Sequence, residues 1–167
     1  MKHQSKKKIL ISIIGFAQGG AEIMPIRIAN VLYEKGYGVA LHCVSNDVDQ
    51  KIKAMLNPKI PVYYTDKFWR MGWIILYHHF KIVNTHSVPS QMLLARTIKR
   101  LPFLKFKHVA TSHGGYEGME SHEALKRIKE IDPYVNCWTF VADNNRLIFQ
   151  KAGISASKLN KISNAMV

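Results

Sequence analysis

Cysteine is scarce in this sequence of 167 residues. The two that are present, Cys43 and Cys137, each lie inside an apolar run. They allow at most one disulfide or one two-cysteine metal site, and a pair of buried, reduced thiols is the simpler interpretation. Reduced thiols indicate a cytosolic compartment.

Long apolar runs are also missing. The most apolar candidate helix, residues 71–80, is well short of the roughly 20 residues that a bilayer-spanning helix needs. The basic start of the chain precedes an apolar run at residues 9–14, but no small-residue cleavage site follows and the run leads into a glycine-rich turn. The sequence therefore predicts neither a signal peptide nor a transmembrane segment.

Acidic residues are few. Asp and Glu number 11 against 24 Lys and Arg, which gives a formal net charge of +13. A field of this size attracts anionic partners. Nucleic acid, acidic phospholipid and phosphorylated saccharides all qualify, and charge does not choose among them. The hydrophobic content of 47% suits a packed core, and the length suits one domain over residues 1–167.

Short β-branched runs alternate with longer segments of helical period. This alternation predicts an α/β fold, a Rossmann-like parallel sheet of about six or seven strands with helices on both faces. Ligands of such sheets bind beyond the carboxyl ends of the strands. The predicted strands are residues 8–14, 39–44, 62–64, 82–85, 108–112, 138–142 and 159–162. The predicted helices are residues 21–35, 47–56, 68–80, 90–100, 121–130 and 144–152. The first has an apolar stripe that includes Ile26 and Val31, and Ser121 is the expected cap of the fifth.

The first loop nearly matches a nucleotide-binding fingerprint. It reads Gly15-x-Ala17-x-x-Gly20, with Ala17 where a glycine would let the backbone approach a pyrophosphate. No Gly-Lys-Ser/Thr follows, so a P-loop is excluded. Gly19 and Gly20 at a helix N-terminus can bind an anion, or they serve only a tight turn. A nucleotide-binding oxidoreductase domain, to which Asp47 after the second strand also points, is the alternative function.

Four segments in order resemble the N-terminal domain of family-four glycosyltransferases, which have the GT-B fold. They are a glycine-containing loop before a helix, a strand that ends in a histidine, a strand that ends in Thr-x-His, and a stretch that leads to the interdomain hinge. The usual hinge has Asn-Gly, and Ala165 replaces the glycine here. The matching segments are Gly19-Gly20-Ala21-Glu22, residues 82–87, residues 109–114, and residues 141–143, 153–154 and 161–164.

The resemblance implies one half of a two-domain enzyme. In this family the N-terminal domain mainly holds the acceptor, and the C-terminal domain holds a nucleotide-sugar and carries Glu-x7-Glu. No two glutamates stand eight positions apart in this sequence, so we expect the donor domain to be absent and this chain to be inactive alone. The implied activity is that of a retaining hexosyltransferase of cell-envelope polysaccharide synthesis, such as lipopolysaccharide or capsule, with no metal or other cofactor.

The resemblance also assigns roles to residues. Gly19 and Gly20 match the loop that approaches the donor phosphates. His113 matches the cleft histidine near the reacting sugar and is the expected catalytic residue, while His86 matches a second cleft position. A strand-end histidine satisfied by backbone groups is the alternative for His113. The candidate acceptor contacts beside them are Glu22, Ser112, Gly114, Gly115 and Tyr116.

Two segments mix cations with large apolar residues, at residues 67–73 and 99–107. Such mixtures suit an anionic membrane surface, single-stranded nucleic acid or an ordinary solvated face. Because the implied acceptors are glycans that are often lipid-linked, we expect a cytoplasmic protein, peripheral on the inner membrane face, with no nucleic acid partner. A non-enzymatic binder of nucleic acid or membrane is a third hypothesis. The adjacent His78 and His79 diverge by about 100° on a helix and make a poor metal pair.

Overall fold

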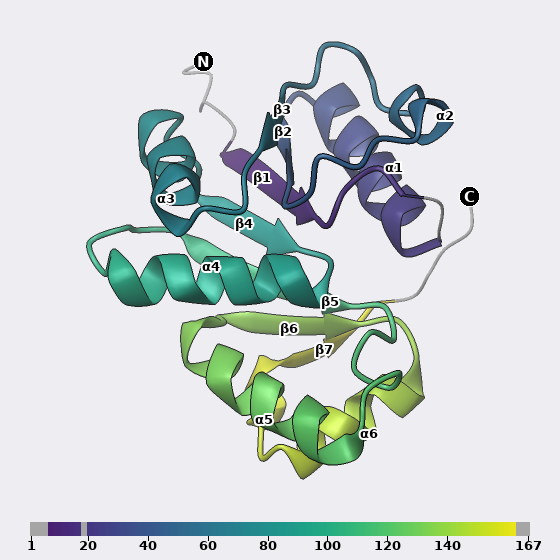
Figure 1. Ribbon diagram of the computed structural model, residues 1–167, viewed down its shortest axis with the longest axis vertical. Coiled ribbons are helices and arrows are strands. Elements are labelled where there is room, and N and C mark those ends of the chain that lie inside the picture. Colours follow the sequence, from purple (N-terminus) through teal and green to yellow (C-terminus); the bar gives the residue numbers. More distant parts are fainter. Residues whose placement is uncertain (1–6, 18–19, 163–167) are drawn as a thin grey trace, which may run out of the picture.

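Seven parallel strands form the central sheet of the computed structural model, which describes residues 7–17 and 20–162 (Figure 1). Their spatial order is β3-β2-β1-β4-β5-β6-β7, and every neighbouring pair is parallel. The predicted Rossmann-like sheet is confirmed. The strands are β1 (Lys8–Ile13), β2 (Gly38–Cys43), β3 (Val62–Tyr64), β4 (Ile82–Thr85), β5 (Lys107–Ser112), β6 (Cys137–Phe140) and β7 (Leu159–Lys161).

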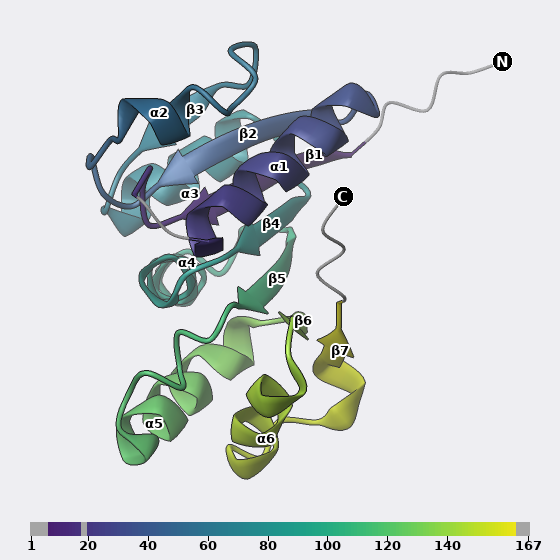
Figure 2. The same ribbon diagram turned by 90° about the vertical axis from the view of Figure 1, so that its right-hand side faces the viewer.

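Helices cover both faces of this sheet, as expected. Right-handed crossovers place α1 and α2 on one face, and α3 to α6 on the other (Figure 2). The helices are α1 (Gly20–Glu34), α2 (Gln50–Lys53), α3 (Phe68–Tyr77), α4 (Val88–Arg100), α5 (Ser121–Ile131) and α6 (Asp143–Lys151), with short 3-10 turns at Asp132–Tyr134 and Ala156–Lys158. None of the described helices is long and apolar enough to cross a membrane.

Three local predictions were wrong. The second helix spans only Gln50–Lys53 rather than residues 47–56. Its late start is set by the Asp49 side chain, which accepts hydrogen bonds from the backbone N–H groups of Lys51 and Ile52. Ser121 is already helical, with Glu120 as the flanking residue and no side-chain cap. Val31, assigned to the apolar stripe of the first long helix, is exposed, whereas Ile26 is buried.

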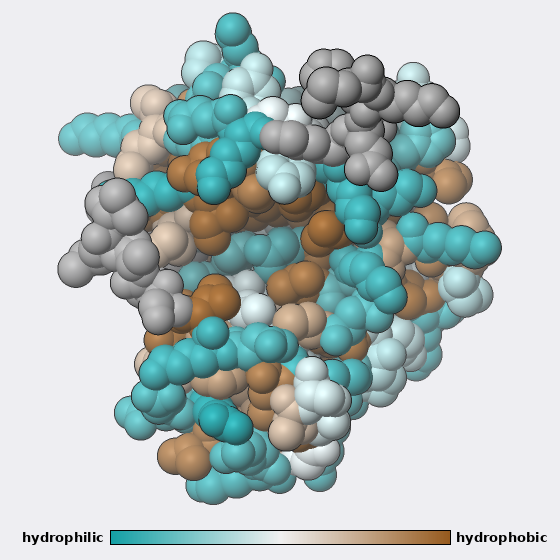
Figure 3. Space-filling model, turned by 180° about the vertical axis from the view of Figure 1, so that it is seen from behind, coloured by the Kyte–Doolittle hydropathy of each residue, from teal (hydrophilic) through white to brown (hydrophobic). Residues whose placement is uncertain are grey.

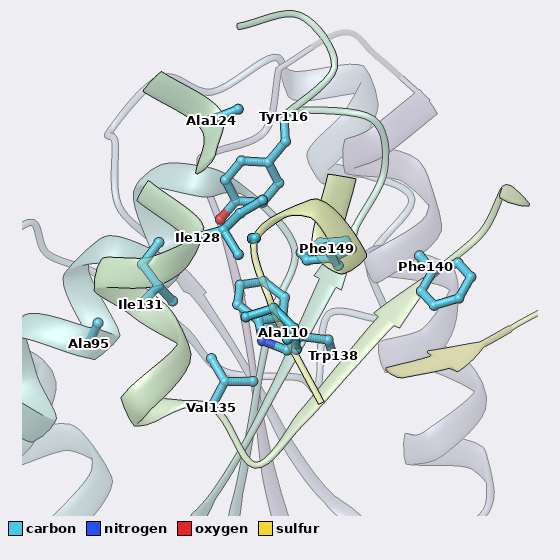
Figure 4. Close-up of a cluster of buried hydrophobic side chains, with 12 residues drawn as sticks. Ala95, Ala110, Tyr116, Ala124, Ile128, Ile131, Val135, Trp138, Phe140 and Phe149 are labelled. Carbon is cyan, nitrogen blue, oxygen red and sulfur yellow. The ribbon is translucent and has the colours of Figure 1, made fainter. Parts of the chain in front are cut away.

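Three apolar clusters hold the layers together. One lies between α1 and strands β1 to β3, and another joins α3 and α4 to β1 and β4. The third lies under α5 and α6, where Trp138 of β6 is fully buried against Phe149 of α6, with ring centroids 4.8 Å apart (Figure 4). Seen from behind, apolar residues gather toward the middle of the surface, and hydrophilic residues surround them (Figure 3).

Candidate functional site

A cavity of ≈ 400 Å³ opens at the carboxyl edge of the sheet. Parallel strands end at one edge, so the loops that follow β1, β4 and β5 meet there. Seven of the predicted site residues line this cavity together, although they come from three separate segments of the chain. They are Glu22 of α1, His86 after β4, and Ser112, His113, Gly114, Gly115 and Tyr116 at the end of β5 and in the loop that follows.

His86 is held in place by its own backbone and by the residue that follows it. Its backbone N–H donates to the carbonyl of Ser12 at 2.9 Å, which extends the β4–β1 pairing by one residue. The next residue, Ser87, caps α4 through a reciprocal pair of hydrogen bonds with Ser90. The strand end and the helix start therefore leave the His86 side chain little freedom of position.

A hydrogen-bonded chain runs through the two histidines. His86 Nε2 is 2.6 Å from Asn84 Oδ1, and His86 Nδ1 is 2.9 Å from His113 Nε2. The amide nitrogen of Asn84 donates to the Val109 carbonyl at 3.0 Å and to the Thr111 hydroxyl at 2.9 Å. These two bonds fix the orientation of the amide, so its oxygen faces His86.

This orientation determines where the imidazole protons lie. Asn84 Oδ1 can only accept a hydrogen bond, so neutral His86 carries its proton on Nε2 and accepts at Nδ1. His113 must then donate from Nε2, which leaves the Nδ1 lone pair of neutral His113 available. His113 therefore presents a hydrogen-bond acceptor, and Asn84 and His86 set that tautomer.

Burial keeps both rings neutral. Burial lowers the pKa of His86 to about 3, with a smaller lowering from His113. Burial also lowers the pKa of His113 from its ordinary value. Neutral histidines at pH 7 can exchange hydrogen bonds with ligand hydroxyls, but they do not supply a positive charge.

Ser112 offers a hydroxyl beside the histidines. Its side chain is 3% exposed, and among the residues that the structure describes its Oγ is one of two buried side-chain oxygens without a hydrogen-bond partner. An unpaired buried hydroxyl is costly unless something else satisfies it. Because Ser112 lines the cavity, a bound ligand can provide that partner.

The loop after His113 is anchored by Tyr116. Gly114 has a φ of 92°, a conformation that L side chains rarely adopt, and a Cβ on Gly115 would lie 3.3 Å from Val88. Tyr116 was predicted as an acceptor contact, but its ring is 1% exposed and packs in the core against Phe149 (Figure 4). Its hydroxyl donates to Gln91, so its side chain serves to fix the loop.

The predicted phosphate loop is described only in part. Gly19 lies outside the described residues, and α1 begins at Gly20. Gly15 lies close to the loop after β2, because a Cβ there would make a tight contact of 3.1 Å with the Asp47 carbonyl oxygen. The neighbouring Phe16 is fully buried and exchanges backbone hydrogen bonds with Asp47 and Asp49. The close approach of this loop to the loop after β2 therefore accounts for Gly15, the first glycine of the segment that nearly matches the nucleotide-binding fingerprint.

Metal-binding chemistry has little support. Within residues 7–17 and 20–162, no three His, Cys, Asp or Glu side chains are grouped so as to hold an ion. Both cysteines are free thiols, as expected, and Cys43 is buried while Cys137 is half-buried. His78 packs its ring between Tyr63 and Tyr77, with ring centroids 5.0 Å from each.

Asn84 was missed in the sequence. It is polar within a short apolar strand and stands two residues before His86, and on a strand residues i and i+2 share a face. That spacing was the available signal. Gln91 was also missed, because its partners are the Thr111 carbonyl and the Tyr116 hydroxyl, from a distant part of the chain.

Solved structures share this fold. HepE of Anabaena in complex with UDP is 17% identical, with a TM-score of 0.74 over 94% of this chain and 44% of that one. The lipopolysaccharide outer core galactosyltransferase WaaB is 13% identical, with a TM-score of 0.74 over 94% and 45%. This chain has the fold of one half of a GT-B glycosyltransferase.

A third similar structure has a size closer to that of this chain. Sucrose-phosphate synthase from Thermosynechococcus elongatus is 11% identical, with a TM-score of 0.63 over 96% of this chain and 90% of that one. The chain spans less than half the length of HepE and WaaB. No protein-family model matches the sequence, and no curated protein matches it.

Proposed function

We propose that this chain is the N-terminal, acceptor-side domain of a retaining glycosyltransferase that moves a sugar from a nucleotide-sugar to a glycan or glycolipid. The observation that carries the proposal is the cavity at the carboxyl edge of a GT-B half, where His86, Ser112 and His113 meet. The donor domain of such an enzyme would close over this edge. HepE has been solved with UDP and with UDP-glucose, which supports a nucleotide-sugar as donor.

Each group in the cavity has a chemical part in this reaction. The N-terminus of α1, which begins at Gly20, would favour the negative charge that develops on the leaving diphosphate. His113, held as a neutral acceptor at Nδ1, would take a hydrogen bond from a sugar hydroxyl. Ser112 would donate its free hydroxyl, and Glu22 would accept from an acceptor hydroxyl. None of these steps uses a metal ion or another cofactor.

Several finer features belong to the same proposal. We propose transfer of a hexosyl group, an acceptor that is lipid-linked, and a place in cell-envelope polysaccharide synthesis, for which the name of WaaB is the one support. A cytoplasmic location follows from a nucleotide-sugar donor. Without a donor domain, we expect the chain to show no turnover.

An oxidoreductase-type nucleotide site is the alternative function, and two observations disfavour it. Ala17 occupies the position where the backbone would approach a pyrophosphate. The close approach of Gly15 to the Asp47 carbonyl accounts for this glycine. The glycine is therefore not evidence of a dinucleotide site.

The first test uses this chain followed by a donor domain, because the donor domain holds the nucleotide-sugar. Long-range ¹H–¹⁵N NMR of the imidazoles is recorded while UDP-glucose is added, and NAD is added in a parallel titration. We expect His113 and His86 to shift with UDP-glucose, and the buried His42 and His108, which lie away from the cavity, to stay unchanged. Shifts with NAD alone would overturn the proposal in favour of the oxidoreductase alternative.

The second test measures catalysis. In a protein where this chain is followed by a donor domain, His113→Ala should lower the transfer rate at least tenfold, since groups that act on the reacting centre contribute about 10²-fold. The matched control is His122→Ala, because His122 is exposed on α5. Equal rates in both variants would show that His113 is only structural.

A further inference from the structure

An apolar stripe is exposed along the outer face of α3. Trp69, Trp73, Leu76 and Tyr77 follow helical spacing, and Trp73 and Tyr77 are 62% and 63% exposed. The rings of Trp73 and Tyr77 stack with centroids 5.7 Å apart, and the Arg70 guanidinium lies 4.9 Å from the centroid of the Trp69 ring. Two exposed tryptophans on a single ten-residue helix are unusual for a surface that faces only water.

The segment after α4 extends this stripe. Phe103 is 62% exposed, and it lines the same shallow hollow as Leu76 and Lys105. Close packing brings the segments together: a Cβ on Gly72 of α3 would lie 2.3 Å from Leu101. Of the nine large apolar side chains exposed in the described part of the chain, five therefore fall on one surface. This aromatic face consists of Trp69, Trp73, Leu76, Tyr77 and Phe103.

Only cations surround the aromatic face in the sequence. Between Asp66 and Glu117 there is no acidic residue, while eight lysines and arginines are present. Four of the cations, all exposed, end α4 or border Phe103: Lys99, Arg100, Lys105 and Lys107. Lys107 also pairs with the segment that leads from α3, because its backbone N–H donates to the Lys81 carbonyl at 2.9 Å.

We infer that the aromatic face is a docking surface for a bilayer rich in anionic phospholipid. Tryptophan and tyrosine prefer the headgroup level, where an apolar ring and a polar edge are both accommodated. The flanking cations meet the negative charge of the lipid, and each contributes about fivefold to partitioning near such a surface. The attachment that we infer is peripheral and reversible.

Docking on this face would set the orientation of the site. Trp69 and Arg70 also line a cavity of ≈ 420 Å³ with Asn46 and Tyr64, at the carboxyl edge of β2 and β3. The Trp69 end of the aromatic face thus adjoins the edge that carries the histidines. A lipid-linked acceptor could enter from there. This last step depends on the proposed function, whereas the docking itself does not.

The experiment is vesicle co-sedimentation of the chain in the absence of sugars and nucleotides. We expect binding to phosphatidylcholine vesicles that contain phosphatidylserine, and much weaker binding to pure phosphatidylcholine. Binding should fall steeply with salt, because the Debye length shrinks from about 10 Å at 0.1 M to about 3 Å at 1 M. Because no substrate is present, failure here leaves the proposed function standing, and loss of transferase activity leaves docking standing.

Two variants with equal charge change locate the surface. In the first, Lys99, Arg100, Lys105 and Lys107 become Ser, and binding should drop at least tenfold. In the control, four exposed cations of α5 and α6 become Ser, and binding should change less than threefold. These control residues are Lys126, Lys129, Arg146 and Lys151. Equal loss from both variants would overturn the assignment to this face.

Tryptophan fluorescence reports insertion directly. Trp69 and Trp73 are exposed and Trp138 is fully buried, so brominated lipid should quench the first two only. Replacing both exposed tryptophans with Phe should abolish the quenching while the protein stays folded. Absence of quenching in the wild-type protein would refute the insertion of the aromatic face. Tighter binding of poly-uridine than of vesicles would assign the face to RNA. A dimer that Trp73→Ser dissociates would assign it to a second copy of the chain, and either result would overturn the proposal.

Discussion

Three buried histidines should make this domain acid-sensitive. Burial lowers the pKa of His42 to about 4, of His86 to about 3 and of His108 to about 4. His42 and His108 are each bonded at both ring nitrogens, to a hydroxyl and to a backbone carbonyl. The neutral ring satisfies both partners, because it donates at one nitrogen and accepts at the other.

The sign of the effect follows from proton uptake. An unfolded histidine has a pKa of about 6.5, so below that pH the unfolded chain binds more protons than the folded chain. The stabilisation is fully present above about pH 6.5 and is lost as the pH falls toward the folded pKa values. At pH 5 each of the three groups lowers the free energy of unfolding by about 2 kcal/mol relative to its value at neutral pH, and the three together lower it by about 6 kcal/mol. This loss is comparable with the whole stability of an ordinary domain, about 5–15 kcal/mol.

Urea unfolding between pH 7 and pH 5 measures this loss. We expect the free energy of unfolding to fall by several kcal/mol, with both circular dichroism and Trp138 fluorescence reporting the same transition. His42→Gln removes one titrating ring and should flatten the pH dependence by about a third, although it costs stability at pH 7. His122→Gln, on the exposed face of α5, should leave it unchanged. A urea midpoint that is constant from pH 7 to pH 5 would refute the reasoning.

Two further predictions concern the hydrogen bonds behind the cavity. Tyr116→Phe leaves the buried Gln91 amide oxygen without its donor, so it should lower the free energy of unfolding in urea by about 1–3 kcal/mol. An unchanged free energy of unfolding would show that this bond is not formed. Asn84→Leu removes the acceptor that sets the His86 tautomer, so long-range ¹H–¹⁵N spectra should show His113 protonated at both nitrogens in turn. Asn84→Asp should preserve the single tautomer. Identical spectra in the wild-type protein and both variants would contradict the hydrogen-bonded chain from Asn84 through His86 to His113.

The alternation of strands and helices could be predicted because the pattern is local. A strand buried on both faces needs a continuous apolar run, as in residues 9–13, and the structure buries all of these residues. The short α2 could not be placed this way, because the hydrogen bonds of Asp49 decide where it begins.

The sequence predicted that His86 and His113 share a cleft, but it did not predict the hydrogen bond between them. Each residue follows a predicted strand, and parallel strands end at one edge, so a shared cleft was expected. Direct contact required β4 and β5 to be neighbours in the sheet, and strand order comes from the packing of all the crossovers together. The burial of Tyr116 was missed because its neighbours, Trp138 and Phe149, come from strands and helices further along the chain.

By itself, the sequence determined the fold class, the excess of positive charge and the residues that end each strand, because these depend on local composition and period. Only the tertiary structure decided which of those residues touch. It placed Asn84 behind His86, left Ser112 without a partner, and joined α3 to the segment after α4 as one aromatic face. Contacts between distant segments depend on strand order and side-chain packing, and both are properties of the whole folded chain.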